Sequence, residues 1–287
     1  MLSVDGASLH YSATGSGPET IVFAHGLFWS GEMFAPQIAA LSGRYRCIAF
    51  DFRGQGRSDV VRGGYDMDTL TRDAAKLIED LGVSPCHFVG LSMGGFIGMR
   101  LAARRPELLR SLALLETSAG PEPAEKQGPY RLMLFAARTF GLRSVVDRLM
   151  PIMFGRTFMT DPERATDRAA WRAKLLSNDR TGIIRATRGV LTRSGVEGEL
   201  GAIAAPTLVI VGDEDVATPP DRARAICAGV SGARLVTIPR AGHTSTIECP
   251  EAVTAALTDF FAGLESPGAA RDVRLNGSAA RSSLARD

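Results

Sequence analysis

The chain has 287 residues, of which 45% are hydrophobic and 22% are charged. These proportions are typical of a globular protein and exclude a disordered or collagen-like chain. The length is enough to bury a full core without disulfide bonds or a structural metal. The 33 Lys and Arg residues nearly balance the 31 Asp and Glu residues, and the formal net charge of +2 argues against a nucleic-acid or polybasic membrane partner. We therefore expect a small-molecule partner, and the sequence leaves the oligomeric state open.

No export signal or membrane-spanning segment is predicted. The first 17 residues contain Asp5, His10 and several Gly and Ser residues instead of an unbroken apolar stretch. The most apolar stretch, residues 88–103, is interrupted by glycines and Arg100 and is shorter than the ~20 residues of a membrane-spanning helix. The four cysteines form neither a CxxC pair nor a cluster with histidine: Cys47, Cys86, Cys227 and Cys249. We expect free thiols in a cytoplasmic protein, with no metal site and no cofactor.

Strands alternate with helices along most of the chain. Residues 2–4 and 8–13 alternate in polarity around Asp5-Gly6, which predicts an edge hairpin. Short apolar runs that each end at a turn residue predict buried parallel strands at 21–24, 47–50, 86–90, 112–115 and 207–211, and a further strand is expected at 234–238. Helical patterns lie between them, for example at 67–81 and 94–104. The pattern predicts an α/β fold with a mostly parallel eight-stranded sheet, helices on both faces and one mixed edge.

The alternation stops after the sixth predicted strand. Four helical patterns follow one another at about 125–140, 143–154, 162–176 and 182–193, between borders rich in Pro and Gly. Such an insertion predicts a helical lid over the strand ends, where these folds bind their ligands. We therefore assign residues 1–118 and 196–264 to a core domain and residues 119–195 to the lid. Residues 265–287 lack periodicity and are predicted to be a disordered tail.

Ser92 is the candidate nucleophile. It lies in Gly90-Leu91-Ser92-Met93-Gly94, a G-x-S-x-G motif between an apolar strand and a helical pattern. In that context the serine is held on a sharp strand-to-helix turn, and the glycines remove side chains that would clash in so tight a turn. The motif therefore predicts nucleophilic catalysis by Ser92.

A serine nucleophile needs a base and a carboxylate that orients the base. Of the four histidines, only His243 lies in a loop between a predicted strand and a predicted helix. The other three lie in the edge hairpin or at the start or end of a predicted strand. Asp215 is the preferred acid because it follows the strand at 207–211 and precedes a helix, whereas Asp213 lies tight against the strand. Glu116, at the end of an earlier strand, is the alternative acid.

Acyl transfer also needs donors for the developing oxyanion, usually two backbone N–H groups. Met93 follows the nucleophile directly and supplies one by position. Leu27, in the loop after the strand at 21–24, supplies the other, and Gly26 allows its backbone to come close.

Together these motifs resemble those of the α/β-hydrolase family. The resemblance covers residues 2–264 and rests on His25-Gly26, the run 51–58, the run 90–95, the run 212–215 and Gly242-His243. Within the family the chain most resembles small bacterial esterases, 3-oxoadipate enol-lactonases and cofactor-free haloperoxidases (perhydrolases). The resemblance implies a triad of Ser92, Asp215 and His243 in that chain order, an oxyanion hole at Leu27 and Met93, and a structural role for Arg53.

The resemblance also excludes some relatives. Haloalkane dehalogenases and epoxide hydrolases of this family have an aspartate where this chain has Ser92, so their ester intermediate on a carboxylate is not available here.

Two features of the sequence bear on the substrate. Large apolar residues are expected to line a pocket, with Phe28 and Trp29 from the oxyanion loop and Phe135 and Trp171 from the lid. Residues 130–193 contain thirteen Lys or Arg against five Asp or Glu. This excess is typical either of a solvated outer face or of a lid that attracts an anionic substrate, such as the carboxylate that enol-lactonases act on.

The sequence therefore predicts a serine hydrolase of small esters or lactones, acting through an acyl-enzyme. Two alternatives stay open. The same triad could cleave a C–C bond or catalyse perhydrolysis, or the fold could serve as a ligand-binding receptor with little turnover.

Overall fold

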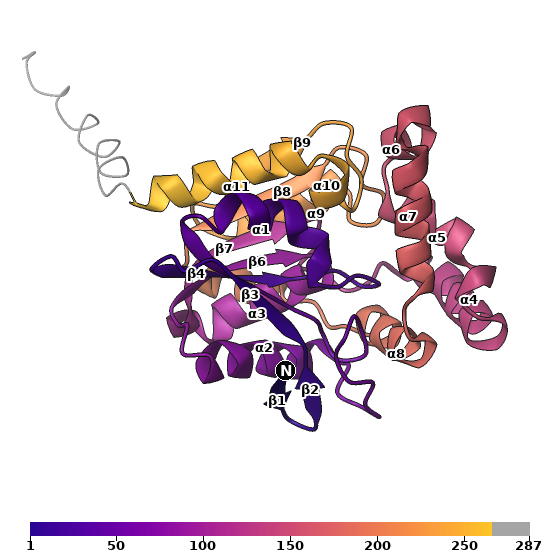
Figure 1. Ribbon diagram of the computed structural model, residues 1–287, viewed down its shortest axis with the longest axis horizontal. Helices are drawn as coiled ribbons and strands as arrows, with labels where there is room; N and C mark the ends of the chain where they lie inside the picture. The colour runs from indigo at the N-terminus through magenta and orange to yellow at the C-terminus, as the bar shows by residue number, and fades with distance from the viewer. Residues whose placement is uncertain (266–287) are drawn as a thin grey trace, which may run out of the picture.

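The computed structural model describes residues 1–265, which form a seven-stranded sheet with helices on both faces (Figure 1). The strand order is β3-β5-β4-β6-β7-β8-β9, and all neighbours pair in parallel except β3 and β5 at one edge. The predicted α/β fold with a mostly parallel sheet is confirmed. The main-sheet strands are β3 (Tyr11–Thr14), β4 (Glu19–Ala24), β5 (Tyr45–Phe50), β6 (Cys86–Leu91), β7 (Leu109–Leu115), β8 (Thr207–Gly212) and β9 (Arg234–Ile238).

The prediction of eight strands in one sheet is wrong. The strand expected at 8–13 is broken at His10, so that β1 (Leu2–Val4) and β2 (Ala7–Leu9) form a separate hairpin and only β3 joins the main sheet. The break has a physical cause in the backbone bonds of His10. Its N–H donates to Ser58 Oγ at 2.9 Å and its carbonyl accepts from Asp51 N–H at 2.9 Å, which ties this residue to the turn after β5.

Two hydrophobic layers enclose the sheet because successive side chains of a strand point to opposite faces. In β4, Val22 and Ala24 pack in one layer, whereas Ile21 and Phe23 pack in the other. The first layer includes side chains of α2 (Met67–Asp80), α3 (Met93–Arg104) and α9 (Pro220–Gly229). The second includes side chains of α1 (Ala35–Leu41), α10 (Ser245–Glu248) and α11 (Pro250–Glu265).

The direction of winding reverses between β4 and β6. β5 follows β4 in the chain and lies on one side of it, while β6 lies on the other side. Ligands of open α/β sheets bind at the carboxyl ends of the strands at such a reversal. The strand ends that meet here are Ala24 and Leu91.

Five α-helices separate β7 from β8, and Figure 1 shows them grouped beyond one end of the sheet. They are α4 (Ala124–Phe140), α5 (Val146–Met153), α6 (Arg156–Thr160), α7 (Ala165–Leu176) and α8 (Arg180–Leu191). The insertion follows the strand from which it was predicted. Four of these helices overlap the predicted patterns, and α6 is missing from the prediction because five residues are too few to show a helical period.

The two ends of the inserted segment are bonded to each other. Val196 N–H donates to Ala119 O at 2.8 Å, and the buried Arg193 pairs with Glu122 at 2.8 Å. At the carboxyl end of the chain, Glu265 is the last residue of α11, and the remainder of the predicted disordered tail lies outside the described residues.

The part of the chain that the structure describes contains no helix long and apolar enough to cross a membrane. All four cysteines are free thiols.

Candidate active site

Ser92 occupies a strained turn between β6 and α3. Its φ of 51° lies in the left-handed region, which a residue with a side chain adopts only when the surroundings impose it. The Ser92 N–H donates to Leu115 O at 2.8 Å. A side chain at Gly94 would place its Cβ 2.0 Å from Ala24 O, so only glycine lets α3 approach β4 this closely. The turn holds Ser92 at the reversal point of the sheet, where it is 8% exposed.

The loop after β4 lies against this turn. Gly94 N–H donates to His25 O at 3.1 Å, and a Cβ on Gly26 would lie 3.4 Å from Ser92 Cβ. Phe28 N–H donates to Gln55 Oε1 at 2.8 Å, which fixes the loop from the other side. Met93 is the first residue of α3, so its N–H has no acceptor within the helix. The structure therefore places both Met93 and Leu27, which lies between Gly26 and Phe28, beside Ser92.

His243 bridges Ser92 and Asp215. Its Nε2 lies 2.9 Å from Ser92 Oγ and its Nδ1 lies 2.9 Å from Asp215 Oδ2. Asp215 also accepts hydrogen bonds from the N–H groups of Ala217 and Thr218, at 2.8 and 3.0 Å, and from Thr218 Oγ at 2.8 Å. A carboxylate at Nδ1 favours the tautomer with its proton there, which leaves Nε2 free to accept the Ser92 proton.

Glu248, a residue that the sequence reasoning missed, holds the His243 loop in place. Its buried carboxylate accepts from the N–H groups of Gly155, Gly242 and Thr244 at 2.8, 3.0 and 3.1 Å, and from Thr244 Oγ at 3.0 Å. Burial raises the pKa of Glu248, and these donors offset part of the rise. Because Gly155 directly precedes α6, the same carboxylate joins the inserted helices to the loop. No short sequence pattern connects Gly155 with Glu248, because the two residues are 93 positions apart in the chain.

Glu116, the alternative acid, lies directly after β7 and is fully buried. Burial raises its pKa well above the usual range, and the charges of Asp215 and Glu248 raise it further. The nearby Ser245 hydroxyl offsets part of this rise, although neither Glu116 oxygen has a hydrogen-bond partner of normal geometry within residues 1–265. His243 bonds to Asp215, so the geometry favours Asp215 over Glu116.

Arg53 lies away from this centre. It is buried and binds both carboxylate oxygens of Asp73, at 2.6 and 2.7 Å, so its expected role in fixing loops is confirmed. Within residues 1–265 no group of three or more His, Cys, Asp or Glu side chains could hold a metal ion.

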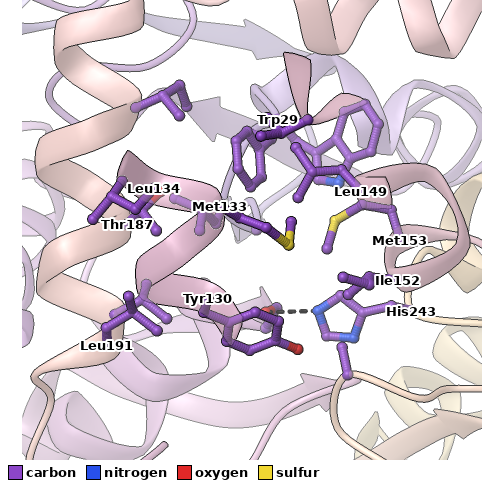
Figure 2. A pocket seen from close by; sticks show the side chains of 18 of the residues that line it. Trp29, Tyr130, Met133, Leu134, Leu149, Ile152, Met153, Thr187, Leu191 and His243 are labelled. Carbon is purple, nitrogen blue, oxygen red and sulfur yellow. Dashed lines mark hydrogen bonds between the residues drawn. The ribbon is translucent and has the colours of Figure 1, made fainter. Parts of the chain in front are cut away.

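A cavity of about 110 Å³ opens onto Ser92 and His243. Figure 2 shows Tyr130 and His243 at its lower end, with Leu134, Thr187 and Leu191 along one wall and Trp29 at the top. Most of the remaining lining is apolar and comes from the segment inserted between β7 and β8, including Met133, Ala137, Leu142, Val145, Leu149, Ile152, Ile183, Ile184 and Val190. The structure therefore places an apolar chamber beside the polar Ser92–His243 pair.

Two of the four predicted pocket residues line this cavity and two do not. Phe28 and Trp29 are lining residues. Trp171 packs edge-on against Trp29, with ring centroids 5.4 Å apart, and forms a layer behind the wall. Phe135 is 62% exposed. The expectation for Phe135 is wrong because it lies on the outer face of α4, one residue beyond Leu134, whose side chain lines the cavity.

Tyr130 and Glu122 line the cavity but were missed as pocket residues. The phase of α4 could have indicated Tyr130, since Tyr130, Met133, Leu134 and Ala137 follow the three- and four-residue spacing of one helix face. Burial and the charge of Glu122 raise the pKa of Tyr130 to about 12, so its hydroxyl stays protonated.

Residues 19–250 match the model of the alpha/beta hydrolase fold family, and the chain belongs to the α/β-hydrolase family of enzymes. Its fold is similar to that of the enol-lactonase from Burkholderia xenovorans LB400, with 32% identity, a TM-score of 0.84, and coverage of 90% of this chain and 98% of that one. It is similar also to a thermophilic esterase from Thermogutta terrifontis, with 30% identity, a TM-score of 0.82, and coverage of 90% and 94%.

Among curated proteins, the chain is 33% identical over 270 residues to a Mycobacterium tuberculosis protein with the provisional name non-heme bromoperoxidase BpoC. The match covers 90% of this chain and 99% of that protein.

Proposed function

We propose that the protein is a serine hydrolase that cleaves a small carboxylic ester or lactone through an acyl-enzyme. The observation that supports this most directly is the continuous chain from Ser92 Oγ through His243 to Asp215, with 2.9 Å at each step, at the mouth of an apolar cavity. The enol-lactonase and the esterase to which the chain is similar act on this class of bond according to their names.

The acylation step follows from these positions. His243 Nε2 takes the proton of Ser92 Oγ as Oγ attacks the carbonyl carbon of the substrate. The resulting oxyanion accepts hydrogen bonds from the N–H groups of Leu27 and Met93. The protonated His243 then gives its proton to the oxygen of the leaving alcohol, the C–O bond breaks, and the acyl group stays on Ser92. In a lactone the released alcohol remains part of the acyl chain.

Deacylation repeats these transfers with water. His243 Nε2 takes a proton from water as its oxygen attacks the acyl-enzyme carbonyl, and the same N–H groups bind the second oxyanion. The proton on His243 returns to Ser92 Oγ and the carboxylic acid leaves. Asp215 orients the imidazole and stabilises its positive charge throughout both steps.

Helices α4 to α8 act as the lid of this site in our proposal. They supply most of the apolar lining and reduce the access of water to the acyl group. Glu248 and the Glu122–Arg193 pair hold the lid in register with the strand ends.

The test is mass spectrometry of the intact protein after exposure to a fluorophosphonate, together with turnover of p-nitrophenyl esters of increasing chain length and of several lactones. We expect one phosphonyl group on Ser92 and hydrolysis well above background. Ser92→Ala should keep the fold, since Ser92 is at the cavity surface, and lose both labelling and turnover. Activity of Ser92→Ala near that of the wild type would refute the assignment.

C–C bond hydrolysis and perhydrolysis use the same triad and are tested in the same assay by adding a diketone, or peroxide with a carboxylic acid. The provisional name of the bromoperoxidase relative makes perhydrolysis the first alternative to examine. Ligand binding without turnover in all of these assays would favour the receptor hypothesis.

A further inference from the structure

The charges around the cavity bear on the substrate class, given the proposed ester or lactone hydrolysis on which this inference rests. The thirteen Lys and Arg residues between positions 130 and 193 suggest at first an anionic substrate. In the structure, seven of them are exposed, five are partly buried and one, Arg193, is buried. None of the thirteen lines the cavity.

The five partly buried cations are bound to other protein groups. Arg164 pairs with Asp167, Arg172 with Asp147 and Lys174 with Glu32. Arg168 donates to the carbonyl groups of Phe158 and Asp161, and Arg185 donates to Val61 O. These bonds direct the charges to the outer side of the lid or into its framework, so none is positioned to neutralise a substrate carboxylate.

Arg193 lies behind the cavity wall, in contact with residues that line it. Its guanidinium is stacked 4.2 Å above the ring centre of Phe96, a lining residue, and it also donates to Glu122, Gly120 O, Val190 O and Ser118 Oγ. Glu122 itself lines the cavity. The pair is therefore neutral as a whole, and its acidic member is the one that lines the cavity.

The other polar side chains of the wall offer uncharged hydrogen-bond donors. The Tyr130 hydroxyl has no partner among the described residues and in Figure 2 points toward His243. Lys126, one turn earlier on α4, donates to Val216 O and Ala217 O at 2.8 and 3.0 Å, which places this face of α4 over the Asp215 loop. Thr187 Oγ1 is buried in the wall without a hydrogen-bond partner within residues 1–265. Such groups bind neutral oxygen atoms and do not compensate a full charge.

We propose that the site selects esters or lactones whose acyl group is uncharged and apolar, and that Glu122, held by Arg193, excludes acyl groups that end in a carboxylate. A carboxylate in this chamber would lose its hydration, meet no Lys or Arg side chain among the described lining residues and lie near Glu122. The cavity of about 110 Å³ is somewhat smaller than the ~150 Å³ apolar cavity that binds benzene, so it accommodates an apolar acyl group of at most roughly six carbon atoms.

The experiment compares p-nitrophenyl hexanoate with mono-p-nitrophenyl adipate, in which a carboxylate replaces the terminal methyl group and the leaving group is the same. We expect kcat/KM for the hexanoate ester to exceed that for the adipate ester by at least about 100-fold at neutral pH. Equal values for the two esters would overturn the proposal.

Substitutions locate the cause of the discrimination. Glu122→Gln leaves the Arg193 charge uncompensated behind the wall and should raise the relative kcat/KM of the adipate ester by about 10-fold or more. Leu134→Arg, which introduces a cation from a partly buried wall position, should act in the same direction even if Glu122→Gln does not fold. Arg172→Gln, on the outer side of the lid, is the control and should leave the ratio unchanged. A ratio that responds to Arg172 and to neither wall variant would overturn the proposal.

The assay also separates this inference from the proposed function. Failure of the wild type to hydrolyse either ester, together with absence of fluorophosphonate on Ser92, would refute serine hydrolysis itself. Hydrolysis of both esters at similar rates would leave serine hydrolysis standing and refute only the charge selection.

Discussion

Glu116→Gln separates the two candidate acids and tests the protonation of a buried group. Glu116 is fully buried next to Asp215 and Glu248, and burial raises its pKa well above the usual range. The native protein therefore keeps a proton on Glu116 at pH values where the unfolded chain has lost it. The free energy of unfolding must fall as pH rises from about 4.5 to the native pKa, by about 1.4 kcal/mol per pH unit. Glutamine does not titrate, so the substitution removes this slope.

The measurement is urea-induced unfolding of wild type and Glu116→Gln at pH 5, 6 and 7 and constant ionic strength. The free energy of unfolding of the variant, relative to wild type, should increase with pH by up to about 2.7 kcal/mol over these two units. Glu248 also has a raised pKa and adds to the pH dependence of the free energy of unfolding. This contribution is present in both proteins, so it cancels when the variant is compared with the wild type. A difference that does not change with pH would refute a protonated Glu116.

The same variant serves in the activity assay, with Asp215→Asn as its counterpart. Asp215→Asn should lower kcat by about 10⁴-fold, the size of effect known for the equivalent change in a serine protease triad. Glu116→Gln should lower kcat less than about 10-fold, because Glu116 makes no hydrogen bond to His243. The reverse ranking would give the acid role to Glu116.

Two further predictions concern the contacts that hold the lid. Glu248→Gln should lower kcat by about 10-fold or more with a smaller change in KM, because an amide cannot accept four hydrogen bonds around the His243 loop; an unchanged rate of fluorophosphonate labelling would contradict this positioning role. Phe154→Ala should lower the free energy of unfolding by about 3–5 kcal/mol, because Phe154 is buried between Trp29 and Phe158. The exposed Phe135 is its control, and Phe135→Ala should change stability by less than about 0.5 kcal/mol.

Local sequence patterns were sufficient to predict the strand-turn-helix around Ser92. Tight turns depend on residues adjacent in the chain, and glycine at 94 is required by the 2.0 Å approach to Ala24 O. The positions of Asp215 and His243 were predictable because each follows a strand of a parallel sheet, and the carboxyl ends of such strands meet at one edge. Sequence could not choose between Asp215 and Glu116 on distance, since both follow strands that are neighbours in the sheet.

The sequence by itself therefore determined the class of fold, the turn that holds Ser92 and the elements that present His243 and Asp215, because periodicity and turn chemistry are local properties of the chain. Tertiary structure decided the break at His10, the role of Glu248 and the lining of the cavity, because each depends on contacts between residues distant in sequence. It also decided whether the excess of Lys and Arg in residues 130–193 lies at the cavity. Composition shows how many charges a segment carries but not where their side chains lie. In the folded chain these cations are exposed or bound to other protein groups, whereas Glu122 lines the cavity.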